Sequence, residues 1–334
     1  MRGLFLFVLR VLVFASFAQF SAIAGEVATE QNEAQVLLKK IQAAAQKLNY
    51  SGIFVYQEAS QMRTSRITHI HDGKNELQKL EMLDGRRREY TKSNDEITCY
   101  VPENKTVLVE KRGTQDEFPA IFGANVAELE AHYQVRKSET DRVAGYDCQV
   151  LLLEPKDNFR YGYKLWAEKN TGLLLRVQTL NERSEIVEQI SFSQLKIGDI
   201  DRTQVKSSFG DTNGWRVENA SINETALTNW LVKWVPPGFK KTRELRRQVS
   251  ANSGMLGSAG REVGQIVFSD GLAAISVFIE NFNPQRVERA QRQGAMNIIG
   301  KRLGDYWLTV VGEVPAVAIR QVANSIEFRP TATK

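Results

Sequence analysis

Histidine is the side chain best suited to proton transfer or metal binding near neutral pH, and this 334-residue chain has three, His69, His71 and His132. His69 and His71 are two positions apart in an extended run, so both side chains face the same side of a strand. Such a pair supplies half of a metal site. No Cys or His near them in the sequence completes the ligand set. We therefore predict no metal site and interpret the pair as polar side chains on an exposed strand face.

A covalent enzyme mechanism needs a nucleophile, a base and a group that orients the base. The sequence contains no Gly-x-Ser-x-Gly elbow, no phosphate-binding loop and no dinucleotide-binding fingerprint. We predict that the protein is not an enzyme and binds no cofactor. An enzyme that uses His69 or His132 as its base stays open as an alternative, because catalytic groups can converge from distant positions.

Three consecutive arginines, Arg86, Arg87 and Arg88, form the first candidate binding feature. In a strand, alternation places Arg86 and Arg88 on one face and Arg87 on the other. An exposed arginine cluster fits an anionic lipid or an acidic peptide. The alternative is a solvated face with local ion pairs to Glu81 and Glu89.

Apolar side chains along a long series of strands form the second candidate feature. Residues 53–56 and 150–153 are apolar on both faces, which predicts that both faces are covered. A curved sheet around a concavity that holds a helix or a lipid meets this requirement, and a dry core under the N-terminal helix is the alternative. The candidate ligand-binding residues, for a lipid or a protein partner, are Phe54, Tyr56, Met82, Arg86, Arg88 and Trp166.

The elements that must position these side chains follow from hydrophobic periodicity. Residues 33–48 have helical spacing of their apolar side chains. From residue 50 onward, extended runs alternate with turn signals such as Asp-Gly, which predicts an antiparallel meander. Strands are predicted at residues 51–56, 66–71, 76–82, 86–91, 96–101, 105–111, 147–154, 161–168, 173–180 and 186–197, with a short helix at 125–132.

The chain then divides at a polar stretch rich in Ser, Asn, Asp and Gly. Residues 206–224 have the composition of a linker. Beyond it, hairpins are predicted at residues 264–280 and 295–311, followed by a helix at 315–326. We expect two β-rich α+β domains. Residues 33–205 form a large antiparallel half-barrel, and residues 225–330 form a small α+β domain.

Residues 1–24 have the features of a cleaved secretory signal peptide. Arg2 precedes an apolar run from Leu4 to Phe20, which ends in the small-x-small triplet of residues 22–24. The run is short for a membrane-spanning helix, which needs about 20 apolar residues. Without residues 1–24, which hold two basic and no acidic residues, the net charge falls from +5 to +3. This mild charge is unlike that of nucleic-acid-binding proteins.

Two cysteines, Cys99 and Cys148, follow the predicted signal peptide. An oxidising compartment outside the cytoplasm permits a disulfide between them. The bond requires Cα atoms within about 7 Å, which the sequence does not establish. A disulfide and two separate apolar thiols both remain open.

Several short segments, in this order and spacing, resemble the RseB/MucB family of periplasmic regulators. In the larger predicted domain they are LNYSG at 48–52, EMLDGRRRE at 81–89, RVAGYDCQV at 142–150 and RYGYKLW at 160–166. In the smaller one they are WVPPGF at 234–239, FSDGL at 268–272 and VGEVP at 311–315. The resemblance extends from about residue 33 to residue 330.

This resemblance implies a fold and a function. The large domain would be an open half-barrel with a helical plug, like the lipoprotein carriers. The protein would bind the periplasmic part of a membrane-spanning anti-sigma factor (RseA/MucA type) and shield it from the site-1 protease. Lipopolysaccharide or another lipid would displace it. The alternative function is a periplasmic lipid or lipoprotein carrier, and a homo-oligomer is compatible with either.

Overall fold

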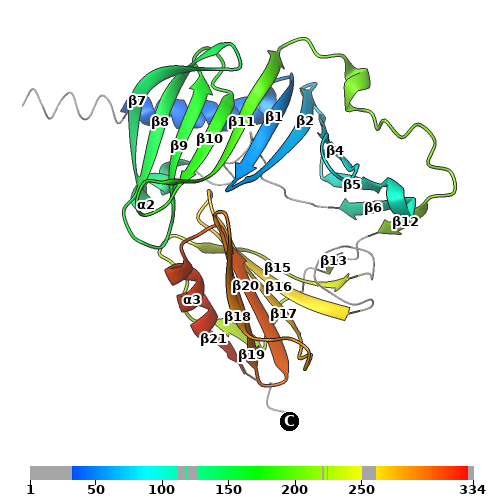
Figure 1. Ribbon diagram of the computed structural model, residues 1–334, viewed down its shortest axis with the longest axis vertical. Coiled ribbons are helices and arrows are strands. Elements are labelled where there is room, and N and C mark those ends of the chain that lie inside the picture. The colour runs from blue at the N-terminus through cyan, green and yellow to red at the C-terminus, as the bar shows by residue number, and fades with distance from the viewer. Residues whose placement is uncertain are drawn as a thin grey trace, which may run out of the picture.

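A computed structural model of the chain describes residues 32–111, 118, 126–219, 222–223, 225–249 and 261–329. The predicted signal peptide lies outside the described residues. Within them, no helix is both long and apolar enough to cross a membrane. The described residues form a large and a small domain, each built on a mainly antiparallel sheet (Figure 1). The predicted β-rich α+β fold class is therefore confirmed.

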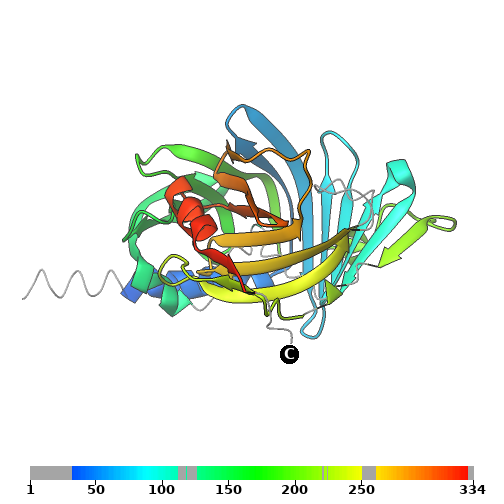
Figure 2. The same ribbon diagram turned by 90° about the horizontal axis from the view of Figure 1, so that it is seen from below.

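The large domain is an open sheet of twelve strands in the order β12-β6-β5-β4-β3-β2-β1-β11-β10-β9-β8-β7. All neighbours pair antiparallel except β12, which runs parallel to β6 at one edge. The strands are β1 (Tyr50–Glu58), β2 (Gln61–His71), β3 (Glu76–Met82), β4 (Glu89–Ser93), β5 (Glu96–Val101), β6 (Thr106–Lys111), β7 (Tyr133–Val143), β8 (Tyr146–Pro155), β9 (Gly162–Glu168), β10 (Leu174–Leu180), β11 (Ile186–Ile197) and β12 (Arg216–Asn219). The sheet curves strongly, which gives it an inner and an outer face (Figure 2).

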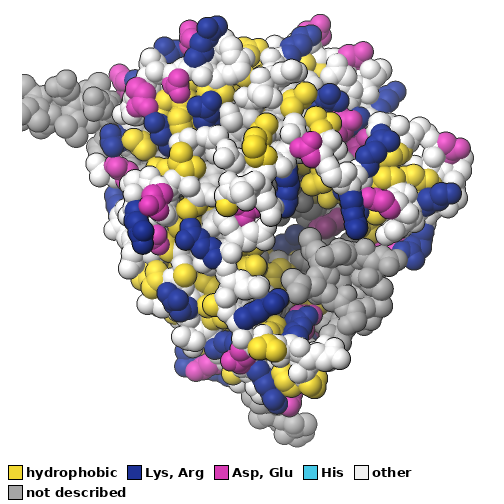
Figure 3. All heavy atoms as spheres, in the orientation of Figure 1, with side chains coloured by type: hydrophobic (Ala, Val, Ile, Leu, Met, Phe, Trp, Pro, Cys, Tyr) yellow, Lys and Arg dark blue, Asp and Glu magenta, His cyan; other side chains and the backbone are white. Residues whose placement is uncertain are grey.

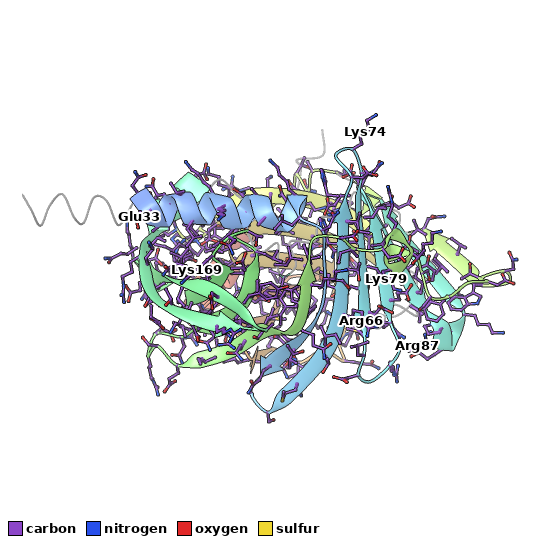
Figure 4. All side chains as sticks on the ribbon, turned by 90° about the horizontal axis from the view of Figure 1, so that it is seen from above. Glu33, Arg66, Lys74, Lys79, Arg87 and Lys169 are labelled. Carbon is purple, nitrogen blue, oxygen red and sulfur yellow. The ribbon has the colours of Figure 1, made fainter. Side chains whose placement is uncertain are left out.

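The inner face carries Phe54 and Phe192, and the helix of residues 32–47 lies across it over β7–β11 (Figure 1). Figure 4 shows Glu33 at the start of this helix. The buried stripe of the helix shares one core with the inner face of the sheet. Its members are Ala34, Leu38, Ile41 and Ala44, each at most 5% exposed. A second helix, α2 (Val126–His132), leads directly into β7.

Residues 198–215, which we call the strap, cross the outer face of the sheet from β11 toward β12. The first half contains the 3₁₀ helix η2 (Arg202–Val205). Ile200 and Val205 pack on Ile70 of β2 and Leu77 of β3 in a small separate core. The strap thus covers apolar side chains that β2 and β3 would otherwise expose.

Polar and aromatic contacts fix the second half of the strap. The backbone N–H of Ser208 donates to both carboxylate oxygens of Glu89, at 3.0 and 3.1 Å, and Glu89 is only 2% exposed. The ring of Phe209 stacks on Tyr100 and lies under the guanidinium of Arg87. Residues that the sequence assigns to a linker are therefore attached to the large sheet as far as β12.

The small domain is a seven-stranded sheet in the order β13-β15-β16-β17-β20-β19-β18, with a two-stranded sheet beside it. Helix α3 (Ala316–Asn324) buries Ala318, Ile319 and Val322 against the sheet. The strands are β13 (Ile222–Asn223), β14 (Trp230–Val232), β15 (Lys240–Val249), β16 (Arg261–Ser269), β17 (Ala274–Asn281), β18 (Arg289–Gln293), β19 (Met296–Leu303), β20 (Tyr306–Gly312) and β21 (Ile326–Phe328). One further element, the 3₁₀ helix η1 (Pro102–Asn104), joins β5 to β6 in the large domain.

Candidate functional site

Phe54, the first of the candidate ligand-binding residues, is part of the core. Its ring lies 5.5 Å from that of Phe118 and 6.0 Å from that of Phe192, measured between centroids. It is 9% exposed. Phe54 therefore anchors the inner face of β1 on Phe118 and Phe192 and presents little surface of its own to a ligand.

Beyond Phe54 the inner face continues as a row of half-buried apolar side chains. Phe54 pairs with Ser65 of β2, and Ser65 pairs with Met82 of β3, so Met82 shares the face of Phe54. The same register brings Leu80, Tyr90, Cys99 and Leu108 of β3–β6 into one line across the strands. These five side chains, Leu80, Met82, Tyr90, Cys99 and Leu108, are neither fully buried nor fully exposed among the described residues. We call them the apolar row.

Tyr56 lies two residues beyond Phe54 on the same face, close to the small domain. Its hydroxyl donates to Glu188 of β11 at 3.0 Å and lies 3.5 Å from Glu58. Burial, and then the two carboxylates, raise the pKa of Tyr56 well above its usual range. The phenol is therefore a permanent hydrogen-bond donor in this part of the inner face.

The three arginines are not in a strand, which corrects the prediction for residues 86–91. The strand β4 begins only at Glu89, because Gly85 (φ 71°) turns the chain and the N–H of Met82 bonds to the carbonyl of Arg88. Their partners also differ from the predicted Glu81 and Glu89. Arg88 pairs with Glu103, Arg87 lies over Phe209, and Arg86 is exposed. Figure 4 shows Arg87 near the strap.

Figure 3 shows one face of the molecule with the charged side chains coloured by sign. On that face, basic and acidic side chains alternate over both domains. Surface ion pairs fit this mixed pattern. In the pair Arg66–Glu81, for example, the side chain of Arg66 is 44% exposed and that of Glu81 is 21% exposed. Pairs of this kind contribute at most about 1 kcal/mol each.

Trp166 lies on the opposite face of the sheet from the apolar row. Val177 of β10 faces inward with Ile190 and pairs with Leu165, so Leu165 is inward and Trp166 outward. The indole N–H donates to Asp141 at 2.8 Å, and the charged groups of Lys164 and Arg176 lie 5.0 and 5.1 Å from the ring centroid. Trp166 is 3% exposed. The structure therefore does not bring Trp166 together with Phe54, Tyr56 and Met82.

His69 is buried, which corrects its assignment to an exposed strand face. It is 1% exposed and stacks on the ring of Tyr50, 5.0 Å between centroids. Its Nδ1 donates to the carbonyl of Leu48 at 2.7 Å, and its Nε2 lies 3.4 Å from Oε1 of Glu76. His69 thus ties the end of the N-terminal helix to β2 and β3.

Both cysteines are free thiols, which settles the choice left open by the sequence. Cys99 is in β5 and Cys148 is in β8, with seven strands between them in the sheet. The two sulfur atoms are not bonded to each other. Burial raises the pKa of both thiols, that of Cys148 to about 11.

The domain interface holds a buried ion pair that the sequence analysis missed. Arg160, in the loop before β9, donates from Nη1 to Asp270 of the small domain at 2.7 Å, and the two side chains are 0% and 1% exposed. Arg160 also bonds to Asp157 of its own domain and to the carbonyl of Pro237 across the interface. Tyr133 donates to Asp270 at 3.3 Å. We call this group of five residues the clamp.

Three of the segments that carry the family resemblance meet in the clamp. Arg160 is in RYGYKLW, Pro237 is in WVPPGF and Asp270 is in FSDGL. Gly238 (φ 84°) lies so close to α2 that a Cβ at this position would be 2.1 Å from Nε2 of His132. The domain interface therefore holds residues from three distant stretches of the chain in close contact. Their clustering was invisible in sequence because Arg160 and Asp270 are 110 positions apart.

The comparisons with known proteins agree with this architecture. Residues 33–209 match the family model of the MucB/RseB N-terminal domain, and residues 224–327 match that of the MucB/RseB C-terminal domain. The sigma factor AlgU regulatory protein MucB of Pseudomonas aeruginosa is 29% identical over 313 residues, covering 92% of this chain and 95% of that protein. The sigma-E factor regulatory protein RseB of Haemophilus influenzae is 25% identical over 319 residues, covering 95% of this chain and 98% of that protein.

Solved structures give the same result. The complex of P. aeruginosa MucA and MucB contains a chain with a TM-score of 0.71 and 27% identity, which covers 90% of this chain and 100% of that one. A structure of MucB with the periplasmic part of MucA contains a chain with a TM-score of 0.68 and 28% identity. The match covers 89% of this chain and 100% of that one. The two family models together cover most of the chain, and the protein therefore belongs to the MucB/RseB family.

Proposed function

We propose that this protein is a periplasmic regulator that binds the periplasmic segment of a membrane-spanning anti-sigma factor and protects it from regulated proteolysis. The observation that carries the proposal is the match to both MucB/RseB domains over nearly the whole chain. The relatives are named regulatory proteins of sigma factors, and MucB forms a complex with MucA. The function requires no catalytic step by this chain.

The location follows from the same proposal and from the N-terminal sequence. An anti-sigma factor that spans the membrane exposes its binding segment outside the cytoplasm, so its regulator must be exported. The apolar run and cleavage triplet of residues 1–24 supply a signal for export. The mature chain would then begin near residue 25, before the helix that packs on the inner face.

A lipid is proposed as the ligand that releases the partner. The support comes from the apolar row on the inner face of β3–β6, whose side chains are half-buried. Apolar surface on a curved sheet fits an acyl chain or the apolar side of a peptide. The same row supports the alternative function, a carrier that delivers lipid to an acceptor membrane.

Isothermal titration calorimetry of the mature chain with the periplasmic segment of the anti-sigma factor from the same genome tests the proposal. We expect a one-to-one complex with a dissociation constant at or below about 1 μM, equivalent to about −8 kcal/mol. Absence of binding at micromolar concentration would contradict it. Native mass spectrometry of the complex between the mature chain and the segment, with added lipopolysaccharide, then tests the release step, since lipid should displace the segment.

A matched pair of methionine variants locates the ligand. Met82→Glu places a charge in the apolar row, whereas Met62→Glu places one on the outer face of β2, where Met62 is already 64% exposed. We expect Met82→Glu to weaken lipid-driven release and Met62→Glu to leave it unchanged. Equal effects of the two variants would rule out the inner face as the lipid site. Lipid transfer to acceptor vesicles, without partner binding, would favour the carrier.

A further inference from the structure

The edge strand β12 lacks the contacts that hold the other strands of the large sheet. It pairs with β6 over four residues, from Arg216 opposite Thr106 to Asn219 opposite Val109, and the pairing is parallel, which is slightly less stable per residue. Among the described residues of the large sheet, β12 is the only strand without a buried side chain, and Val217 is 60% exposed. Backbone hydrogen bonds to β6 are therefore its main attachment.

The side chains of β12 do not match the face of β6 that they extend. Glu218 is directly opposite Leu108, so it continues the apolar row on the inner face, and Arg216 shares this face two residues away. Arg216 and Glu218 form an ion pair in which 54% and 21% of the side chains are exposed. The apolar row therefore ends against a charged strand, which adds no apolar cross-strand contact to it.

The attachments on either side of β12 let it leave β6 without movement of the domains. Before it, the strap is held at Ser208 and Phe209. After it, β13 pairs with β15 of the small domain (Figure 1). Arg243 of β15 also forms an ion pair with Glu110 of β6 at 3.9 Å, which joins the two sheets at this end independently of β12. Residues 210–221 can therefore shift while both of their flanks stay in place.

We propose that the edge of β6 is the docking site for an extended segment of the protein partner, which displaces β12 and adds its own strand to the large sheet. This inference rests on the proposed function, in which the partner is the periplasmic segment of an anti-sigma factor. Strand addition supplies affinity through main-chain hydrogen bonds and specificity through alternate side chains. β6 extends from Thr106 to Lys111, and β12 pairs with it only as far as Val109, so a longer segment gains bonds that β12 does not make.

The apolar row defines the side chains that the segment should carry. The register aligns Tyr90, Cys99 and Leu108 across β4, β5 and β6, and the next position in this line is now held by Glu218. An aliphatic or aromatic side chain there would extend the row by one strand and exclude water from Leu108. The segment should therefore be apolar at every second position, with these side chains on the inner face.

A reversible disulfide between β12 and β6 tests the proposal in the full mature chain. Val217 and Val107 are directly opposite each other, so Val217→Cys and Val107→Cys are within reach of a disulfide, and Cys99→Ala and Cys148→Ala remove the native thiols. We expect the oxidised chain to bind the fluorescently labelled segment about tenfold or more weakly than the same chain after reduction, because β12 can no longer leave. Equal affinity of the two forms, measured by fluorescence anisotropy, would overturn the proposal.

Hydrogen exchange on the parent protein supplies a second test, which needs no substitution. With the segment at saturation, residues 216–219 should lose protection while residues 106–111 keep theirs, because the segment takes over the hydrogen bonds of β6. Protection at residues 216–219 that stayed the same or increased would contradict the displacement of β12.

Two glutamate variants test the role of the apolar row. Glu218→Leu places an apolar side chain opposite Leu108, so β12 should compete better for β6 and weaken binding of the segment by about two- to fivefold, the usual weight of one cross-strand pair. Glu96→Leu, at an exposed position beside the β4–β5 turn, should leave the affinity unchanged. Tighter or unchanged binding by Glu218→Leu would contradict the assigned register. A parent protein that did not bind the segment would contradict the proposed function itself, whereas binding that survives the disulfide would contradict only the strand exchange.

Discussion

Arg160 of the large domain and Asp270 of the small domain face each other across the interface with 2.7 Å between Nη1 and Oδ2, and both side chains are almost completely buried. The remaining donors of Arg160 bond to Asp157 and to the carbonyl of Pro237, while the other oxygen of Asp270 accepts the N–H groups of Leu272 and Ala273. A buried pair with its hydrogen bonds this fully satisfied fixes geometry more than it adds stability.

Removing one partner of this pair should be strongly destabilising. Arg160→Ala leaves the Asp270 carboxylate buried without its cation, and we expect a loss of about 3–5 kcal/mol in the free energy of unfolding. Urea denaturation monitored by tryptophan fluorescence measures it. Arg136→Ala removes a surface partner of Glu154, with 48% and 50% of the side chains exposed, and should cost less than about 1 kcal/mol. Equal losses in the two variants would show that the clamp is not a buried pair in solution.

Phe54 should behave as a core residue. Because it is 9% exposed and contacts Phe118 and Phe192, Phe54→Ala should lower the free energy of unfolding by about 3–5 kcal/mol. Met62→Ala, at a position that is 64% exposed, should change it by less than about 0.5 kcal/mol. If Phe54→Ala were as stable as the parent, the aromatic cluster on the inner face would not exist as described.

The strap should depend on Glu89. This carboxylate accepts the backbone N–H of Ser208 and lies 3.8 Å from Nζ of Lys79, which is itself 7% exposed. Glu89→Ala should release the strap and cost about 1.5–3 kcal/mol, the usual loss for a hydrogen bond to a charged group. Hydrogen exchange at residues 206–215 measures the release directly. Protection there that survives the substitution would mean that the aromatic contacts of Phe209 hold the strap alone.

Stability should fall in acid through Glu76. The ring of His69, whose Nε2 lies 3.4 Å from Oε1 of Glu76, and then Lys92 lower the pKa of Glu76 from 4.5 to about 2. A carboxyl group with a lowered pKa stabilises the fold above pH 4.5, and this contribution is lost as the pH falls toward 2. Unfolding free energies measured across this range should therefore fall less steeply for Glu76→Gln than for the parent. A steeper fall in the variant would contradict the assigned contacts.

The strand pattern of the large domain could be predicted because most of its strands alternate or are apolar throughout. The strand β7 was missed, since residues 137–142 are polar and its second half is exposed at the edge of the sheet. The strand β15 was missed for a similar reason, because five of its ten residues are Lys or Arg. Edge strands and highly charged strands lack the hydrophobic period on which the prediction depends.

The candidate site was only partly predictable. The composition of the strands selected Phe54, Tyr56, Met82 and Trp166 as candidates, but the sequence offered no way to tell that Trp166 lies on the opposite face of the sheet from the other three. Their faces depend on strand register, which shifts at irregularities such as the one between Ile53 and Phe54. A one-residue shift moves a side chain to the other face. The Arg160–Asp270 pair required the three-dimensional arrangement of both domains.

Protection of the anti-sigma factor from cleavage is the most direct test of the proposed function. The measurement is the rate at which the site-1 protease cleaves the periplasmic segment of the anti-sigma factor from the same genome, with and without an excess of the mature chain. We predict that the mature chain slows cleavage in proportion to the fraction of segment bound, and that added lipopolysaccharide restores the rate. An unchanged cleavage rate with saturating mature chain would contradict the account.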